Sequence, residues 1–89
     1  MVSKEIAIKN PLGLKSKAAA LFIHKSSNYK SSIWIEKDDR KANAKSLLGL
    51  LSLGISMGET VILAAEGDDE KVALEELEEY VNNDLGENG

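Results

Sequence analysis

Apolar residues alternate with polar or small ones at the start of the chain, and a helical period follows. The alternation covers residues 5–8, which predicts a half-buried strand that ends at the turn signal Asn10-Pro11. From Ser16 onward, the residues expected to face inward recur at helical spacing, namely Ala19, Phe22, Ile23 and Ser26. We therefore expect a strand, a loop and a first helix that breaks at residues 26–28.

The middle of the chain predicts a hairpin and then a short apolar helix. Residues 33–36 alternate like a strand, Asp38-Asp39 forms a turn, and a second strand of weaker propensity returns over residues 40–44. The run of residues 47–53 contains five leucines, and Ser46 directly before it is a residue type that caps helices. Gly54 and Gly58 then close this unit.

The last third of the chain predicts one more strand and a closing helix. The strand pattern covers residues 60–65 and ends at Gly67. Asp68-Asp69-Glu70 supplies carboxylates at the start of the helix, where the helix dipole favours negative charge. The apolar stripe of this helix comprises Ala73, Leu74, Leu77 and Val81. We expect the helix to fray over residues 82–84.

This order of elements predicts an α+β open-faced sandwich in one domain that spans residues 1–89. A four-stranded antiparallel sheet would be covered by three helices on one face, in the order βαββαβα. Trp34 and Ile62 would then point away from the helices. Two interpretations stay open for this pair, a dimer surface or apolar residues scattered on an exposed face.

The composition is that of an ordinary globular protein, and its charge argues against direct nucleic-acid binding. Eleven Lys and Arg against fifteen Asp and Glu give a net charge of -4, so the chain as a whole does not attract a phosphate backbone. Lysines gather before residue 46 and carboxylates after residue 58, which indicates either a dipolar surface for an acidic or phosphorylated protein, or two solvated faces. The absence of cysteine excludes disulfides and thiolate metal sites.

We expect a cytoplasmic protein that does not enter a membrane. The first residues lead directly into the strand pattern and carry no secretion signal. Apolar stretches such as residues 61–65 are far too short to span a bilayer.

Several local motifs occur in a recognisable order along the chain. They are Gly13-Leu14, Ala19-Ala20-Leu21-Phe22, Glu36-Lys37-Asp38, Asn43-Ala44-Lys45-Ser46 with Gly49 and Ser52-Leu53, and Glu66-Gly67-Asp68-Asp69-Glu70. Through them the chain resembles the HPr phosphocarrier family of the bacterial sugar phosphotransferase system, and especially the regulatory Crh branch of that family. The resemblance covers nearly the whole chain and is most specific over residues 43–53, which are similar to the family's regulatory serine loop.

The chain departs from the family at the motif that carries the phosphate-accepting histidine. Here that position holds Lys15, while Lys17 and Ala18 replace the accompanying arginine and proline. A lysine side chain is protonated at neutral pH and then has no lone pair to offer phosphate, so Lys15 is a poor acceptor. The Crh branch also lacks the histidine, but it keeps the arginine and the proline. Lys15 and Lys17 beside a helix N-terminus indicate either an anion site or drift after loss of the histidine.

His24, the sole histidine, lies nine residues beyond Lys15 and cannot occupy the same site, since that separation along a helix is about 13 Å. One interpretation places it on a partner-binding face with Lys17 and Ala20, at offsets of three and four residues. The other is an exposed helix histidine without a role. We expect no metal site and no cofactor, because no second histidine or cysteine is present to share an ion.

Ser46 is expected to cap the leucine-rich helix, which by itself accounts for a serine there. The resemblance adds that Ser46 is phosphorylated by HPr kinase/phosphorylase, and a phosphate at a helix N-terminus is tolerated by the dipole. Leu47, Leu48 and Leu51 would then form an apolar docking patch beside the added charge.

The resemblance therefore implies a regulatory protein, not an enzyme, that acts as corepressor with a catabolite-control transcription factor. Two alternatives stay open: a phosphocarrier with an unusual acceptor, and an unmodified decoy that occupies partner surfaces. The expected assembly is a monomer or a weak homodimer.

Overall fold

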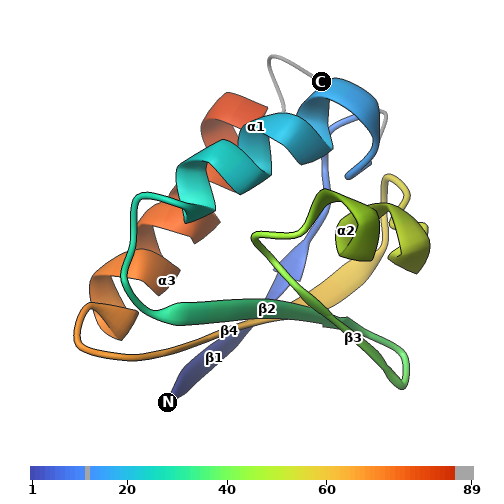
Figure 1. The fold of residues 1–89 in the computed structure, drawn as a ribbon. Helices are drawn as coiled ribbons and strands as arrows, with labels where there is room; N and C mark the ends of the chain where they lie inside the picture. The colour runs from blue at the N-terminus through green and yellow to red at the C-terminus, as the bar shows by residue number, and fades with distance from the viewer. Residues whose placement is uncertain (12, 86–89) are drawn as a thin grey trace.

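The computed structural model describes residues 1–11 and 13–85 and confirms the expected order of elements. Strands β1 (Val2–Ala7), β2 (Ser32–Lys37), β3 (Arg40–Asn43) and β4 (Thr60–Glu66) form one antiparallel sheet in the order β1-β4-β2-β3. Helices α1 (Ser16–Ser26), α2 (Leu47–Leu53) and α3 (Glu70–Glu79) lie on one side of this sheet (Figure 1). The fold is the open-faced sandwich that the sequence pattern predicts. No helix in the described ranges has the length and apolar character needed to cross a bilayer.

The hydrophobic core fills the space between the sheet and the three helices. Alternation in the strands sends every second side chain inward, where it meets the apolar stripes of the helices. The largest fully buried apolar side chains are Phe22, Ile8, Leu14, Ile35, Leu50, Ile55, Leu63, Leu77 and Val81. Each helix and three of the strands or their adjoining loops contribute to this set, so the layers stabilise one another through burial.

The opposite face of the sheet carries Trp34 and Ile62, as the alternation predicts. Ile62 is 37% exposed, whereas Trp34 is half-buried. The ammonium group of Lys41, on the adjacent strand β3, lies 4.3 Å from the centre of the Trp34 ring, a cation–π contact. Ala64 is opposite Trp34 on β4 and is only 2% exposed. The strict alternation of buried and exposed residues expected for β4 is therefore wrong at Ala64, a small residue that lies between Ser3 of β1 and Trp34 of β2 in the register of the sheet.

The end of α3 differs from the expected fraying. The chain continues past Glu79 as a π-helical segment, η1 (Tyr80–Leu85). Val81 within it is 2% exposed and belongs to the core. Burial of this side chain holds the backbone in a helical path across residues whose own helix propensity is low.

Two loops that are distant in sequence meet at Gly13, just before α1. Gly13 has a positive φ of 67°, and the N–H of Leu14 donates a hydrogen bond of 3.1 Å to the carbonyl of Ile55, in the loop after α2. A Cβ atom added to Gly13 would lie 2.8 Å from the Cα of Ser56 and would collide with the Ile55 carbonyl. A residue without a side chain is therefore required where these loops touch.

We predict that Gly13→Ala destabilises the protein by about 2–4 kcal/mol, because it combines left-handed backbone strain with a clash against backbone that cannot yield. Gly54→Ala is the matched control: Gly54 also has a positive φ, of 62°, but nothing lies within 4 Å of an added Cβ. This control should lose only about 1 kcal/mol. Urea denaturation measures both, and equal losses would show that the contact between the loops is not tight.

Candidate functional site

Ser46 forms the N-terminal cap of α2. Its backbone is extended, with φ -113° and ψ 115°, and its side-chain oxygen accepts a hydrogen bond of 3.1 Å from the Gly49 N–H. The Ser46 carbonyl accepts the bond from Leu50 N–H at 3.0 Å, which begins the helix. The capping role expected from the sequence is confirmed. Ser46 itself is half-buried, at the start of a helix whose first turn contains no acidic residue.

The five leucines of α2 divide into two buried and three exposed side chains. Leu50 and Leu53, three residues apart, are buried at 0% and 2% exposure. The candidate docking residues Leu47, Leu48 and Leu51 are exposed, at 47%, 80% and 43%. Exposed apolar side chains therefore begin directly after the Ser46 cap. Met57, 57% exposed in the loop after α2, is another exposed apolar side chain of this region and was not anticipated.

Two cations from the β2–β3 hairpin bind the C-terminal end of α2. The Lys37 ammonium donates to the carbonyls of Leu53 at 3.2 Å and Gly54 at 2.9 Å. The Arg40 guanidinium donates to the Ser52 carbonyl. Cations at this position are favourable, because the last carbonyls of a helix lack partners and carry the negative end of its dipole. The clamp of Lys37 and Arg40 thus fixes the end of α2 opposite Ser46.

Lys37 is itself held by Glu59. Its ammonium lies 2.8 Å from Glu59 Oε2, and Glu59 Oε1 accepts the Ser56 N–H at 2.8 Å. Hydrogen bonding from Lys37, followed by that from Ser56, lowers the pKa of Glu59 below its ordinary value. The carboxylate therefore orients the cation that caps α2 and the loop that follows α2.

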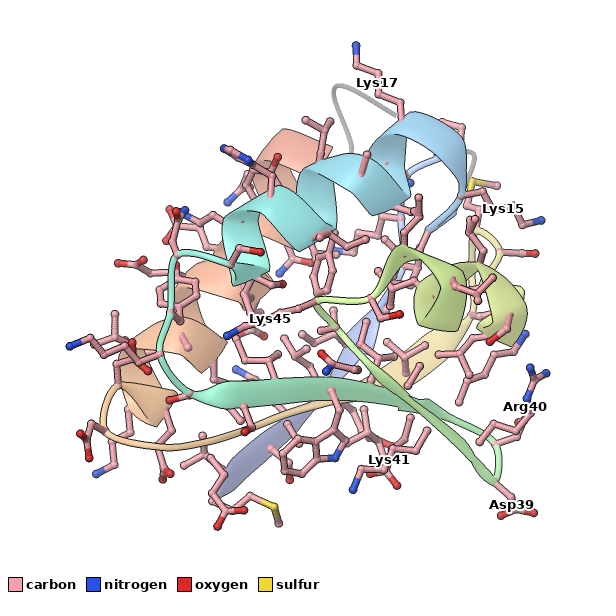
Figure 2. All side chains as sticks on the ribbon, viewed as in Figure 1. Lys15, Lys17, Asp39, Arg40, Lys41 and Lys45 are labelled. Carbon is pink, nitrogen blue, oxygen red and sulfur yellow. The ribbon has the colours of Figure 1, made fainter. Side chains whose placement is uncertain are left out.

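Lys15 occupies the N-cap position of α1, but its side chain makes no capping hydrogen bond. Its carbonyl accepts the N–H groups of Ala18 at 3.1 Å and Ala19 at 3.4 Å. Lys15 and Lys17 are both exposed, and Figure 2 shows their side chains pointing in different directions. The two ammonium groups therefore do not point toward a common position beside the N-terminus of α1.

The other expected partner-binding residues lie along the exposed side of α1. Lys17, Ala20 and His24 are all solvent-exposed, and α1 packs against α2. His24 lies in the last turn of α1, where a basic residue suits the helix dipole. In the part of the chain that the structure describes, no group of three His, Cys, Asp or Glu side chains could hold a metal ion.

Comparison with known proteins identifies the family. The family profile described as "PTS HPr component phosphorylation site" matches residues 2–83. The chain belongs to the HPr family.

Two relatives within the family carry the name HPr-like protein Crh. The one from Bacillus subtilis is 41% identical over 85 residues, covering 96% of this chain and all of the relative. The one from Halalkalibacterium halodurans is 43% identical over 84 residues, covering 94% of this chain and all of the relative. The resemblance to the HPr family and its Crh branch, first seen in the sequence motifs, is confirmed.

Solved structures of the HPr family confirm the fold. HPr-C-His from Thermoanaerobacter tengcongensis matches with a TM-score of 0.93 and 46% identity, covering 97% of each chain. The crystal structure of Bacillus subtilis Crh, described as a swapped dimer, matches with a TM-score of 0.74 and 43% identity, covering 92% of this chain and 94% of that one. In the present chain, β1 pairs with β4 of the same chain.

The sequence pattern predicts the cap at Ser46 and the leucine-rich helix, but it gives no indication of the clamp formed by Lys37 and Arg40. The residues of the clamp and the carbonyls they bind are separated by 12 to 17 positions, beyond the reach of a local pattern. The available signal was that α2 has no basic residue in its own last turn. The last carbonyls of α2 could therefore accept hydrogen bonds from a cation elsewhere in the chain.

We predict that the Lys37–Glu59 pair makes folding stability depend on pH in the acid range. A carboxylate whose folded pKa is lowered stabilises the fold above its unfolded pKa, about 4.3, and loses that contribution as the pH falls through the folded pKa. Glu59→Gln should therefore show a shallower loss of stability on acidification than the unchanged protein.

Denaturation midpoints measured in urea across this pH range test the prediction. Glu5→Gln, which removes one carboxylate from the exposed outer face of β1, serves as the control and should keep the original slope. Equal slopes for Glu59→Gln and the unchanged protein would contradict the role given to the pair.

Proposed function

We propose that this chain is a Crh-like regulatory protein of the HPr family, phosphorylated on Ser46 by HPr kinase/phosphorylase. The phosphorylated form binds a catabolite-control transcription factor and acts as its corepressor in carbon catabolite repression. It thereby acts on genes without itself contacting DNA, in keeping with its net charge of -4. The observation that carries the proposal is the position of Ser46, at the cap of α2 and next to the exposed Leu47, Leu48 and Leu51.

The geometry at Ser46 supports a switch that does not unfold the protein. A phosphate group brings about -1.5 to -2 charges to a helix N-terminus, which the dipole and the free N–H groups of the first turn stabilise. The Lys45 ammonium is directed elsewhere, since it donates to the carbonyls of Tyr29 at 2.8 Å and Ser31 at 3.0 Å (Figure 2). The added charge is therefore available to a partner and is not neutralised by the neighbouring lysine.

The proposed partner surface combines this charge with apolar and basic groups. Leu47, Leu48 and Leu51 offer the apolar part. Lys17, Ala20 and His24 of α1 offer a second exposed strip, on a helix that packs against α2. A partner that contacts both helices would need donors for the phosphate, most effectively arginines, together with an apolar pocket for the leucines.

Phosphorylation of Ser46 is predicted to occur with HPr kinase/phosphorylase, ATP and magnesium, and to place one phosphate on this residue. Ser46→Ala should abolish incorporation, whereas Ser52→Ala, which removes the serine within α2, should incorporate phosphate normally. Intact-mass measurement and phosphosite mapping give the readout. A phosphate on another serine, or none beside a phosphorylated HPr control, would contradict the proposal.

The loss of the cap needs its own control, because Ser46→Ala also costs the helix about 1 kcal/mol. Ser46→Asn keeps a side-chain acceptor for the Gly49 N–H while removing the hydroxyl that is phosphorylated. It should retain the stability of the unchanged protein and still accept no phosphate. Binding to the transcription factor, followed by calorimetry, should then require the phosphorylated form and fail with this variant.

The main alternative is a phosphocarrier, which would take phosphate from phosphoenolpyruvate through enzyme I. We expect no acid-labile label on this chain, because its N-cap residue at α1 is Lys15 and its histidine lies in the last turn of that helix. Lys15→His alone should give little or no transfer, since Lys17 and Ala18 also differ from the carrier motif. Labelling as strong as that of a carrier HPr run in parallel would establish the alternative instead.

A homodimer is compatible with the family, since solved relatives include a dimer of HPr from Thermoanaerobacter tengcongensis and the dimer of Crh. We propose that this chain is a monomer or a weak homodimer in the cytoplasm. Each chain can close its own sheet through the β1–β4 pairing, so assembly is not needed to complete the fold.

A further inference from the structure

A hollow lies at the end of the sheet where β2 extends beyond β3. β3 pairs with β2 from Lys37 back to Trp34, and the preceding residues of β2 have no β3 residue opposite them. The hollow is open to solvent and has a volume of about 340 Å³. Its lining comes from residues 30–34 and from residues 41–43 and 45, so it joins the start of β2 to β3 and the approach to Ser46.

The charge of this hollow contrasts with the charge of the chain. Three lysines line it, Lys30, Lys41 and Lys45, and none of its described lining residues is an Asp or a Glu. The chain as a whole has fifteen acidic residues and a net charge of -4. A carboxylate-free concave surface with three ammonium groups is therefore a local positive region in an acidic protein, and it favours an anion.

Two of the three lysines are already fixed in position. Lys45 Nζ is bonded to two backbone carbonyls, those of Tyr29 and Ser31, which leaves one of its three N–H donors for a ligand. Lys41 Nζ is held 4.3 Å from the centre of the Trp34 ring. Figure 2 shows Lys41 and Lys45 on opposite sides of β2, so the charges flank the hollow from two directions. Lys30 is exposed and free to adjust.

The polar lining suits a ligand that accepts several hydrogen bonds. Ser32 and Asn43 add neutral polar groups, and Trp34 adds an apolar wall. Asp69 accepts the N–H groups of Lys30 and Ser31, both at 2.9 Å, and the Ser31 hydroxyl also donates to it. Asp69 therefore holds the rim of the hollow from the side of α3 instead of lining it.

We propose that this hollow binds a small phosphate monoester. The phosphate is a dianion at neutral pH with three acceptor oxygens, which suits a hollow lined by lysines and neutral polar groups and by no described carboxylate. The hollow is larger than inorganic phosphate and is open to solvent, so a small organic group attached to the phosphate has room beside the lysines.

Trp34 is the sole tryptophan of the chain and reports directly on the hollow. Its fluorescence should change in a saturable manner on titration with AMP or glycerol 3-phosphate. Adenosine and glycerol, the matching molecules without phosphate, should have no effect. Inorganic phosphate should compete, but more weakly than the better of the two esters. Isothermal titration calorimetry gives the same affinities without relying on the indole.

Lys30→Met and Lys41→Met test the charges, because neither ammonium group bonds the backbone in the described structure. Each variant should weaken ester binding about tenfold, the effect of losing one charge-assisted contact. Lys9→Met removes the same charge at an exposed position outside the hollow and should change the affinity less than about twofold.

Three results would overturn the proposal. The first is an absence of saturable binding with both esters. The second is equal binding of an ester and its phosphate-free match, or of inorganic phosphate and both esters. The third is an equal loss of affinity in Lys9→Met and Lys41→Met, which would show that ester binding depends on the net charge of the chain and not on the lysines of the hollow.

Discussion

A helix of seven residues gains too little from its own hydrogen bonds to persist in water, so α2 exists because of what holds it from outside. Burial of Leu50 and Leu53 fixes one side of the helix against the core. The side chain of Ser46 caps its first turn, and Lys37 and Arg40 bind the carbonyls of its last. The candidate site depends on this constraint, because the same helix presents the serine and the exposed leucines.

The two ends of α2 are treated differently, and that difference has an electrostatic consequence. The negative end is neutralised by two cations of the β2–β3 hairpin, while the positive end at Ser46 has only a neutral hydroxyl as its cap. A negative group added at Ser46 would therefore lie at the positive end of the helix dipole, where the first turn contains no acidic side chain. The helix is already held in place by its buried leucines and by Lys37 and Arg40. A large gain in charge at this surface is therefore compatible with an unchanged fold.

The loop before α1 positions the N-terminus of that helix without a contribution from the Lys15 side chain. Gly13 and Leu14 are held against Ile55 by a close contact and a backbone hydrogen bond. The next residue, Lys15, is exposed, and its side chain takes no part in capping α1. The geometry that positions the N-terminus of α1 thus does not rely on the side chain at position 15. A substitution there alters the chemistry available at the surface without disturbing the contact between the loops.

The sequence by itself determined the order of elements, the inward faces and the cap at Ser46, because each follows from a period or a residue type within a few neighbouring positions. It also indicated the family through the motif around Ser46. The tertiary structure alone decided which leucines of α2 are buried, that Ala64 is buried opposite Trp34, that Val81 extends the last helix, and that Lys37 and Arg40 cap α2. It also placed Lys30, Lys41 and Lys45, which are 4 to 15 positions apart in the sequence, around one hollow. These features arise where the register of the sheet and the packing of helices bring separate segments together, and no local pattern records which segments will meet.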